Sequence, residues 1–456
     1  MAIAVIAGGV AGSANAGAMT RAEIFVGDGE GGSVRSDADR LLAAAETRGA
    51  IPIIVTLRTD FAPEAELSMF AAANQRTAIA SLQDRVLARV PSEENVKTFK
   101  TVPMVAMTVN ERGLQALLSD SNVAAIHEDI PHPPTLDESV PIIKANKVWK
   151  RKGKTGKGWT VAVLDTGVDR GHRAFRNKIV SEACFSTNSP VDNATSVCPR
   201  GVSASTKRKS GKYCDLAVEG CDHGTHVAGI AVGNPNNRFK GVAKGAKLIP
   251  IQVFTRFENS SFCTFGDPCA LSFTSDQIAG LERVFQLRNK FKIASVNMSL
   301  GGSPVTGACK TDPLRPIIQN LRSAKIATVI ASGNNSATGA ISAPACIPEA
   351  IAVGATDKDD TIAPYSNQSK LVDVMAPGSD IHAPVPKNSY GTKSGTSMAT
   401  PHVAGTWAVL KQRHKNASVS QIEKALECTG KKVRDRGPGK PRIDVLKAYG
   451  KVKNGC

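Results

Sequence analysis

Residues 160–167 read TVAVLDTG, a run of apolar and β-branched residues that ends in an aspartate and a glycine-containing turn. Four later segments have the same continuous apolar character, separated by stretches long enough for helices: 247–253, 293–298, 326–331 and 350–353. Fully apolar strands that alternate with helices are typical of a parallel sheet covered on both faces. From about residue 158 onward, the sequence therefore predicts an α/β fold, a parallel β-sheet with helices on both faces.

A smaller unit precedes this sheet. Residues 51–57 (IPIIVTL) form a β-branched run, residues 98–110 contain a second strand-like segment, and residues 123–126 resemble a closing strand. Asn110 is placed to cap a short helix before the closing strand. Apolar residues recur at helical spacing in two stretches: Ile79, Leu82, Val86 and Val90, then Leu114, Leu117 and Leu118. Two strand–helix–strand passages predict a small α+β ferredoxin-like unit. The prolines at 131, 133 and 134 mark a linker after it.

The N-terminal residues have the features of a targeting segment. Residues 1–10 (MAIAVIAGGV) are apolar, and ANA at 14–16 fits an A-x-A cleavage site, so residues 1–18 are predicted to be signal peptide-like. Residues 19–50 are rich in Gly, Ala and Asp and are expected to be a linker of low order. Residues 27–32 formally fit GxGxxG, but no long strand and βαβ unit accompany them, so dinucleotide binding is not supported. Nothing else approaches 18 consecutive apolar residues, so no membrane span is expected.

The cysteines indicate an oxidising compartment. All ten lie after residue 183, and an even number without a CxxC pair favours disulfides over zinc or a redox dithiol. Disulfides persist outside the reducing cytosol, so we expect a secreted protein, extracellular or periplasmic. Proximity in the sequence suggests the pairs 184–198, 214–221, 263–269, 309–346 and 428–456.

The formal net charge is +17, and basic clusters occur at 150–154 and 207–209. Neither cluster is interleaved with aromatic residues or belongs to a nucleic-acid-binding motif. Both are therefore interpreted as solvated loops, and no nucleic-acid partner is expected.

Three short motifs place polar residues at element boundaries. Asp165 follows the first apolar strand, His223 begins HGTHVAG at the start of a predicted helix, and Ser397 lies in GTSMATPH, where a turn leads into an apolar helix. In parallel sheets, the active site forms at the carboxyl ends of the strands. A serine hydroxyl becomes a nucleophile when an imidazole takes its proton, and the imidazole needs a buried carboxylate to fix its tautomer. The sequence thus contains the three residue types of a serine-protease triad.

The order Asp, His, Ser with the motifs DTG, HGTHVAG and GTSMATPHVAG resembles the subtilisin (peptidase S8) family, over roughly residues 139–450. The resemblance implies a serine endopeptidase in which Asp165 orients His223, His223 is the general base and acid, and Ser397 attacks the peptide carbonyl. The second histidine of its motif, His226, is structural by the same match. No cofactor is then required for the chemistry.

Two further segments resemble parts of the family's site. Residues 331–334 (ASGN) resemble the segment whose asparagine binds the oxyanion, which implies that Asn334 is the oxyanion-hole donor. Residues 297–302 (NMSLGG) resemble the strand that pairs with the extended substrate and lines the first specificity pocket. The implied substrate-binding residues are Ser299, Leu300 and Gly301. Residues 335–344, expected to border this pocket, carry no charge, which favours an apolar residue before the scissile bond (P1).

Competing motif interpretations lack the residues that they need. GTSMA lacks the second glycine of the GxSxG elbow, and HGTH lacks the glutamate and spacing of the HExxH zinc motif. The leading interpretation is a monomeric protease of broad specificity for proteins and peptides. One alternative is a processing protease for a single target, although acidic residues near the pocket are limited to a scattered group at 357, 359 and 360. The other is an inactive binding module, whose usual sign is a lost triad or oxyanion residue.

The front unit resembles the family's inhibitory propeptide, which implies a self-processing proenzyme with its own propeptide as inhibitor. The expected parts are a signal peptide-like segment (1–18), a linker (19–50), a propeptide domain (51–136) and a peptidase domain (137–456). On the same match, cleavage falls between Leu136 and Asp137, with Leu136 in the first pocket. The family often binds structural calcium: Glu138 stands at the position of one ligand, but residues 173–175 (RAF) lack the carboxylate of another. The metal ligands therefore stay unknown.

Overall fold

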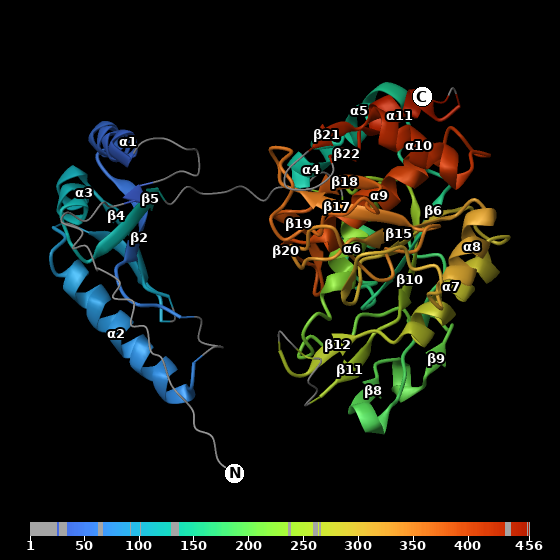
Figure 1. Cartoon of the computed structure of the whole chain (residues 1–456), viewed down its shortest axis with the longest axis horizontal. Helices are drawn as coiled ribbons and strands as arrows, with labels where there is room; N and C mark the ends of the chain where they lie inside the picture. Colours follow the sequence, from blue (N-terminus) through green and yellow to red (C-terminus); the bar gives the residue numbers. More distant parts are fainter. Residues whose placement is uncertain are drawn as a thin grey trace, which may run out of the picture. The chain divides into compact units, whose positions relative to one another are not determined.

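The computed structural model describes residues 25–26, 34–62, 67–91, 93–100, 102–128, 136–235, 239–258, 263, 266–433, 439–453 and 455. The chain divides into two compact units, residues 1–133 and 134–456, each treated by itself below (Figure 1). Within the described ranges, every helix is too short or too polar to cross a membrane.

The first unit is a five-stranded sheet with three helices. Its strands, in the order β1-β5-β2-β4-β3, are Phe25–Val26, Val123–Glu128, Ile51–Leu57, Met104–Val109 and Glu94–Thr98. The helices are α1 (Val34–Arg48), α2 (Met69–Leu87) and α3 (Glu111–Leu118). Strands β5, β2, β4 and β3 pair antiparallel, and α2 and α3 make the two connections, which is the βαββαβ arrangement of the ferredoxin-like fold. The predicted α+β fold of this unit is confirmed.

Alternation along β2 explains how this small sheet acquires a core. Ile51, Ile53, Val55 and Leu57 are buried, and the residues between them are partly exposed. The buried side chains pack in one cluster with residues of α2 and α3, including Leu82. Asn110 caps α3 as predicted, because its side chain accepts a hydrogen bond from the backbone N–H of Gly113 at 3.0 Å.

One expectation for this unit is wrong in part. Residues 34–48 of the expected low-order linker form helix α1, whose Leu41 and Ala45 are buried in the core of the unit. These two residues are four positions apart and so lie on one face of the helix, a period that the glycine-rich composition of the preceding residues obscured. The strand-like segment predicted at 98–110 contains β4, and an unpredicted strand, β3, lies just before it and ends at Thr98. The signal peptide expected at residues 1–18 lies outside the described residues.

The second unit is built on a ten-stranded sheet, mostly parallel, in the order β21-β22-β18-β17-β15-β13-β6-β10-β7-β9. These strands are Lys431–Val433, Lys440–Arg442, Val374–Pro377, Ile351–Thr356, Ala327–Ala331, Ile293–Met298, Thr160–Asp165, Lys247–Gln252, Ala183–Phe185 and Ala204–Ser205. Smaller sheets join β8 (Ala194–Ser196), β11 (Thr255–Phe257) and β12 (Cys269–Leu271), β14 (Pro304–Val305) and β16 (Ile341–Ser342), and β19 (Ile381–Val385) and β20 (Ser389–Lys393). The helices are α4 (Leu136–Ile142), α5 (Ala145–Lys152), α6 (His223–Val232), α7 (Thr274–Leu287), α8 (Arg315–Ser323), α9 (Thr396–Lys411), α10 (Val419–Thr429) and α11 (Val445–Lys451).

The central strand β6 shows why helices cover both faces of this sheet. Its residues are all buried, and successive side chains point to opposite faces. Val161 and Val163 pack in one hydrophobic cluster with residues of α6 and α9. Ala162 and Leu164 pack in a second cluster with residues of α7 and α8. The predicted parallel sheet with helices on both faces is confirmed.

Four of the five predicted disulfides are confirmed: Cys184–Cys198, Cys214–Cys221, Cys263–Cys269 and Cys309–Cys346. The fifth predicted pair includes Cys456, which lies outside the described residues. Each confirmed bridge closes a short stretch of chain in the second unit, and a native disulfide typically contributes about 2–4 kcal/mol to stability.

Candidate active site

The carboxyl ends of neighbouring parallel strands bring the predicted residues to one edge of the large sheet. Strand β6 lies between β10 and β13, and β13 lies beside β15. Asp165 ends β6, and the segments after β13 and β15 carry the predicted substrate-binding residues and Asn334. Helices α6 and α9 begin with His223 and Thr396–Ser397. A cavity of about 720 Å³ is lined by most of the predicted site residues: His223, Ser299, Leu300, Gly301, Asn334 and Ser397.

Asp165 and His223 form a direct hydrogen-bonded pair. Nδ1 of His223 lies 2.8 Å from Oδ1 of Asp165, and the exposed fractions of the two side chains are 22% and 1%. Because a carboxylate only accepts, Nδ1 is the donor and Nε2 is left to accept a proton. Burial lowers the pKa of His223, but the charge of Asp165 and its hydrogen bond raise it more, so the pKa lies above its ordinary value.

A glycine allows helix α6 to begin so close to the strand that ends in Asp165. A Cβ atom on Gly224 would lie 2.4 Å from the carbonyl oxygen of Gly167 and 3.1 Å from Oδ1 of Asp165. Any side chain at this position would therefore push the helix away from the carboxylate. The glycine of HGTHVAG thus sets the spacing of the Asp165–His223 pair.

Ser397 lines the same cavity as His223 but is hydrogen-bonded elsewhere. Its Oγ donates to the carbonyl oxygen of Ser299 at 3.3 Å, and Oγ of Ser299 donates to the carbonyl oxygen of Ser397 at 2.8 Å. Among the hydrogen bonds of the described residues, none joins Ser397 to His223. For the predicted proton transfer, the Ser397 hydroxyl would have to turn toward His223, and catalytic hydrogen bonds are often long or misaligned before substrate binds.

Asn334 is oriented by a residue that the sequence analysis missed, Thr396. Oδ1 of Asn334 accepts from the backbone N–H of Thr396 at 2.8 Å and from its hydroxyl at 2.9 Å. With Oδ1 occupied, the Nδ2 group of Asn334 has no hydrogen-bond partner among the described residues. The amide is therefore a free donor in the cavity that contains Ser397.

The loop that carries Asn334 is fastened by a second missed residue, the fully buried Asn367. Its Nδ2 donates to the carbonyl oxygen of Ser332 at 3.0 Å, and its Oδ1 accepts from the backbone N–H groups of Asn335 and Ala337, both at 3.0 Å. Asn367 follows a different strand from Asn334, and no motif marked it. Only the folded arrangement brings the two segments together.

His226 is near His223 in the sequence, but its side chain contacts backbone groups of another segment. Its Nε2 lies 2.9 Å from the carbonyl oxygen of Ile381 and 3.1 Å from that of Gly391. Burial, together with the charges of His223 and Lys393, lowers its pKa to about 3. His226 is therefore neutral at ordinary pH and joins α6 to the hairpin of β19 and β20.

Residues that were expected to border the first specificity pocket do line the cavity, together with one residue that was not expected there. Asn335, Ser342, Ala343 and Pro344 line the cavity, all from the uncharged stretch 335–344. Asp312, which the sequence analysis did not consider, also lines it.

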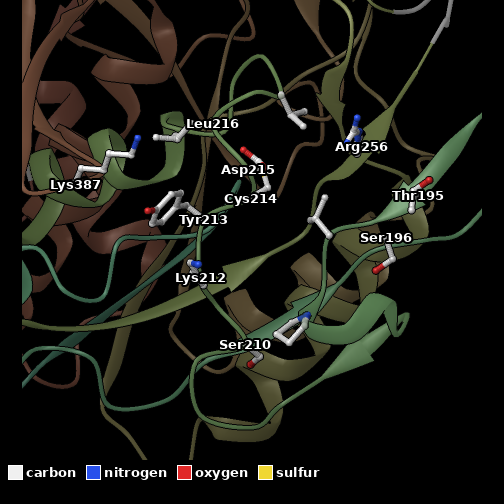
Figure 2. Close-up of a pocket in the computed structure, with 13 residues that line it drawn as sticks. Thr195, Ser196, Ser210, Lys212, Tyr213, Cys214, Asp215, Leu216, Arg256 and Lys387 are labelled. Carbon is white, nitrogen blue, oxygen red and sulfur yellow. The ribbon is translucent and has the colours of Figure 1, made fainter.

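A second cavity, of about 650 Å³, lies over the disulfide-bonded insert of this unit (Figure 2). Lys212, Arg256 and Lys387 line it together with Tyr213 and Asp215, and Figure 2 shows these side chains around the hollow. None of the predicted site residues lines this cavity. This cavity is therefore separate from the predicted catalytic residues.

One group of carboxylates has the spacing of a cation site, and no motif in the sequence marked it. Asp373, Glu423 and Glu427 each offer an oxygen within 4.8 Å of the others. However, Arg322 forms an ion pair with Glu423, and burial raises the pKa of Asp373 to about 7. Arg322 thus already pairs with one carboxylate of this cluster, and burial favours the neutral form of another, so the cluster offers little negative charge to calcium. The side chain of Glu138 lies outside the described part of the chain.

The parallel sheet, with the Asp165–His223 pair at its edge beside Ser397, defines a subtilisin-like serine protease. Residues 156–449 match the subtilase family (peptidase S8), more than half of the chain, and the chain therefore belongs to this family.

Several curated proteins are similar to most of the chain. Subtilisin E of Bacillus subtilis (strain 168) is 32% identical over 342 residues, covering 73% of this chain and 77% of subtilisin E. The alkaline protease of Alkalihalobacillus alcalophilus is 32% identical over 362 residues, covering 78% of this chain and 80% of that protein. The crystal structure of a cold adapted subtilisin-like serine proteinase matches with 29% identity and a TM-score of 0.48, over 64% of this chain and 90% of that one.

Proposed function

We propose that the protein is a secreted serine endopeptidase that hydrolyses peptide bonds through Asp165, His223 and Ser397. The observation that carries this proposal is the 2.8 Å hydrogen bond between His223 and Asp165, beside a cavity that His223, Ser397 and Asn334 all line. A histidine held by a buried carboxylate, in the same cavity as a serine, is the set of groups that activates a hydroxyl for acyl transfer.

The proposed mechanism follows from the side-chain atoms of these residues that remain able to accept or donate a hydrogen bond. Nε2 of His223 takes the proton of Ser397 as Oγ attacks the peptide carbonyl, and the imidazolium that forms is stabilised by Asp165. The negative charge on the carbonyl oxygen is received by Nδ2 of Asn334 and the backbone N–H of Ser397, which lies in the first turn of α9. His223 then protonates the leaving amine, and water hydrolyses the acyl-enzyme with His223 again as base. None of these steps uses a cofactor, and any calcium would serve stability.

Protein and peptide substrates are proposed to bind along β13. Ser299, Leu300 and Gly301 follow this strand at the cavity and would pair with an extended substrate backbone. The pocket walls include Leu300, Leu314, Ala343 and Pro344, and apolar walls support broad specificity with acceptance of apolar side chains before the scissile bond. All four triad and oxyanion residues are retained, which argues against an inactive binding module.

We further propose that the protein is made as a self-processing proenzyme with the first unit as its inhibitory propeptide. Its ferredoxin-like fold, its lack of cysteines and the division of the chain after residue 133 support this. Leu136 and Asp137, the proposed cleavage position, are the first two residues of α4. N-terminal sequencing of purified protein should give a start within about five residues of Asp137, whereas Ser397→Ala should stay full length. A wild-type start upstream of residue 120 would contradict the junction.

The activity is tested with casein and a serine-directed covalent inhibitor. We expect hydrolysis that the inhibitor abolishes and that Ser397→Ala lacks. Ser323→Ala is a matched control, because this exposed serine bonds only the carbonyl oxygen of Asn320 and should leave activity unchanged. Folded wild-type protein that cleaves no substrate after propeptide removal would favour the binding-module alternative.

A further inference from the structure

Asp312 lies in the wall of the cavity that contains the proposed catalytic serine. It belongs to the segment between β14 and α8. This segment is attached to another one, which carries Ser342, Ala343 and Pro344 in the cavity wall. Strand β14 pairs with β16, the backbone N–H of Gly302 donates to the carbonyl oxygen of Ala343 at 2.8 Å, and the Cys309–Cys346 disulfide ties the two segments together. The position of Asp312 is therefore fixed relative to Ser342, Ala343 and Pro344.

The carboxylate of Asp312 has no cation to neutralise it among the described residues. It is half-buried, and its Oδ1 accepts from the backbone N–H of Leu314 at 2.8 Å, which holds the side chain in place. Arg315 is engaged elsewhere, because its guanidinium binds Glu349 and the carbonyl oxygen of Lys310. Among the described residues that line the cavity, there is no lysine or arginine and no other carboxylate.

We propose that Asp312 determines specificity by favouring a lysine or arginine side chain before the scissile bond. The inference rests on the proposed protease function and refines its substrate class. The long methylene stem of a basic side chain would lie along Leu300, Leu314 and Ala343, and its charged end would meet the carboxylate of Asp312. An ion pair at a partly buried site is stronger than one in open water, because the surroundings screen it less.

The predicted preference for apolar side chains rested on residues 335–344, which carry no charge. Asp312 comes from a different segment, so its charge was not assigned to the pocket. The apolar walls and the single carboxylate are compatible, because lysine and arginine present both an apolar stem and a charge.

The test compares peptides that differ only in the residue before the scissile bond: arginine, lysine, or methionine, which is long and uncharged. The mature enzyme, Asp312→Asn and Asp359→Asn are each assayed for kcat/KM. The Asp312→Asn substitution keeps a side-chain oxygen that can accept from the backbone N–H of Leu314 and removes only the charge. Asp359 is a matched control, since it also accepts a backbone N–H two residues later, from Thr361 at 2.9 Å, but is exposed outside the cavity.

In Asp312→Asn we expect the ratio of kcat/KM for arginine over methionine to fall about tenfold, with the methionine value within about twofold of wild type. Asp359→Asn should leave the ratio unchanged. High salt should lower the ratio in wild type and not in Asp312→Asn. A ratio that is the same in wild type and Asp312→Asn would overturn the role of Asp312 while leaving the protease function intact. Failure to cleave any of the peptides would instead count against the proposed function.

Discussion

The two halves of the proposed catalytic site are held together by different means. In the acid–base half, Asp165 and His223 contact each other directly, side chain to side chain, at 2.8 Å. In the half that would attack the substrate and stabilise its charge, Asn334 is held by Thr396, the neighbour of Ser397, and Ser397 is bonded to Ser299. The first half depends on two motif residues and a glycine spacer, and the second depends on contacts from other segments. Apart from loss of Ser397 itself, substitutions should therefore have larger effects in the first half than in the second.

Loss of the imidazole should have the largest effect. We expect His223→Ala to lower kcat by about 10⁶, the size typical for triad members of serine proteases in this family. Because His223 and Ser397 act on one proton, the double variant His223→Ala/Ser397→Ala should be no slower than either single variant. Residual rates measured on an activated peptide substrate test this, with thermal unfolding as the control for folding. Additive losses would show that the two residues do not act as a unit.

Asp165→Asn should lower kcat by about 10⁴, because the amide no longer fixes the tautomer or stabilises the imidazolium. Its pH profile is the sharper measurement. Activity requires neutral His223 and so rises as pH passes upward through the pKa of this group, which Asp165 holds above its usual 6.5. Without the carboxylate, burial dominates and the pKa falls, so the acidic limb of kcat should move to lower pH. If the acidic limb did not move, the group that titrates there would not be His223.

In the second half, Asn334→Ala should lower kcat by about 10²–10³ with little change in KM. The reason is that Nδ2 would bind the oxygen only after negative charge has developed on it. Steady-state kinetics on one peptide measure both constants. A rise in KM with unchanged kcat would place Asn334 in ground-state binding instead of charge stabilisation.

The smallest expected effect is that of Thr396→Val, a few-fold to about tenfold in kcat. It removes the 2.9 Å hydroxyl bond to Asn334 and the oxygen that accepts from the backbone N–H of Gly333 at 3.2 Å, but it keeps the backbone N–H bond to Asn334. Thr400→Val is the matched control, because this buried hydroxyl in the same helix donates to the carbonyl oxygen of Thr396 and not to Asn334. Thr396→Val should cause no further loss in an Asn334→Ala background, since it acts by positioning that amide. An equal loss in both backgrounds would refute this positioning role.

The features that could be predicted from the sequence are those that are marked by one continuous stretch of residues. Strand β6 and the placement of Asp165 at its end follow from a continuous apolar run and a turn, and the starts of α6 and α9 follow from their motifs. Four disulfides follow from proximity, because each joins cysteines that are adjacent in the order along the chain.

The residues that were missed act through contacts between distant segments. Asn367 lies 30 to 35 residues after the residues that it fastens, and Asp312 reaches the pocket only through strand pairing and a disulfide. Neither residue type is informative alone, because asparagine and aspartate are common in turns. Helix α1 was missed for another reason: the composition of its surroundings outweighed a short helical period.

The most direct test of the central claim is to map the residue that a fluorophosphonate modifies in the mature enzyme. Peptide mass spectrometry should find the label on Ser397, and labelling should be lost in Ser397→Ala and much slower in His223→Ala. An active enzyme that carries the label on a different residue, or that stays active without any label, would contradict the account.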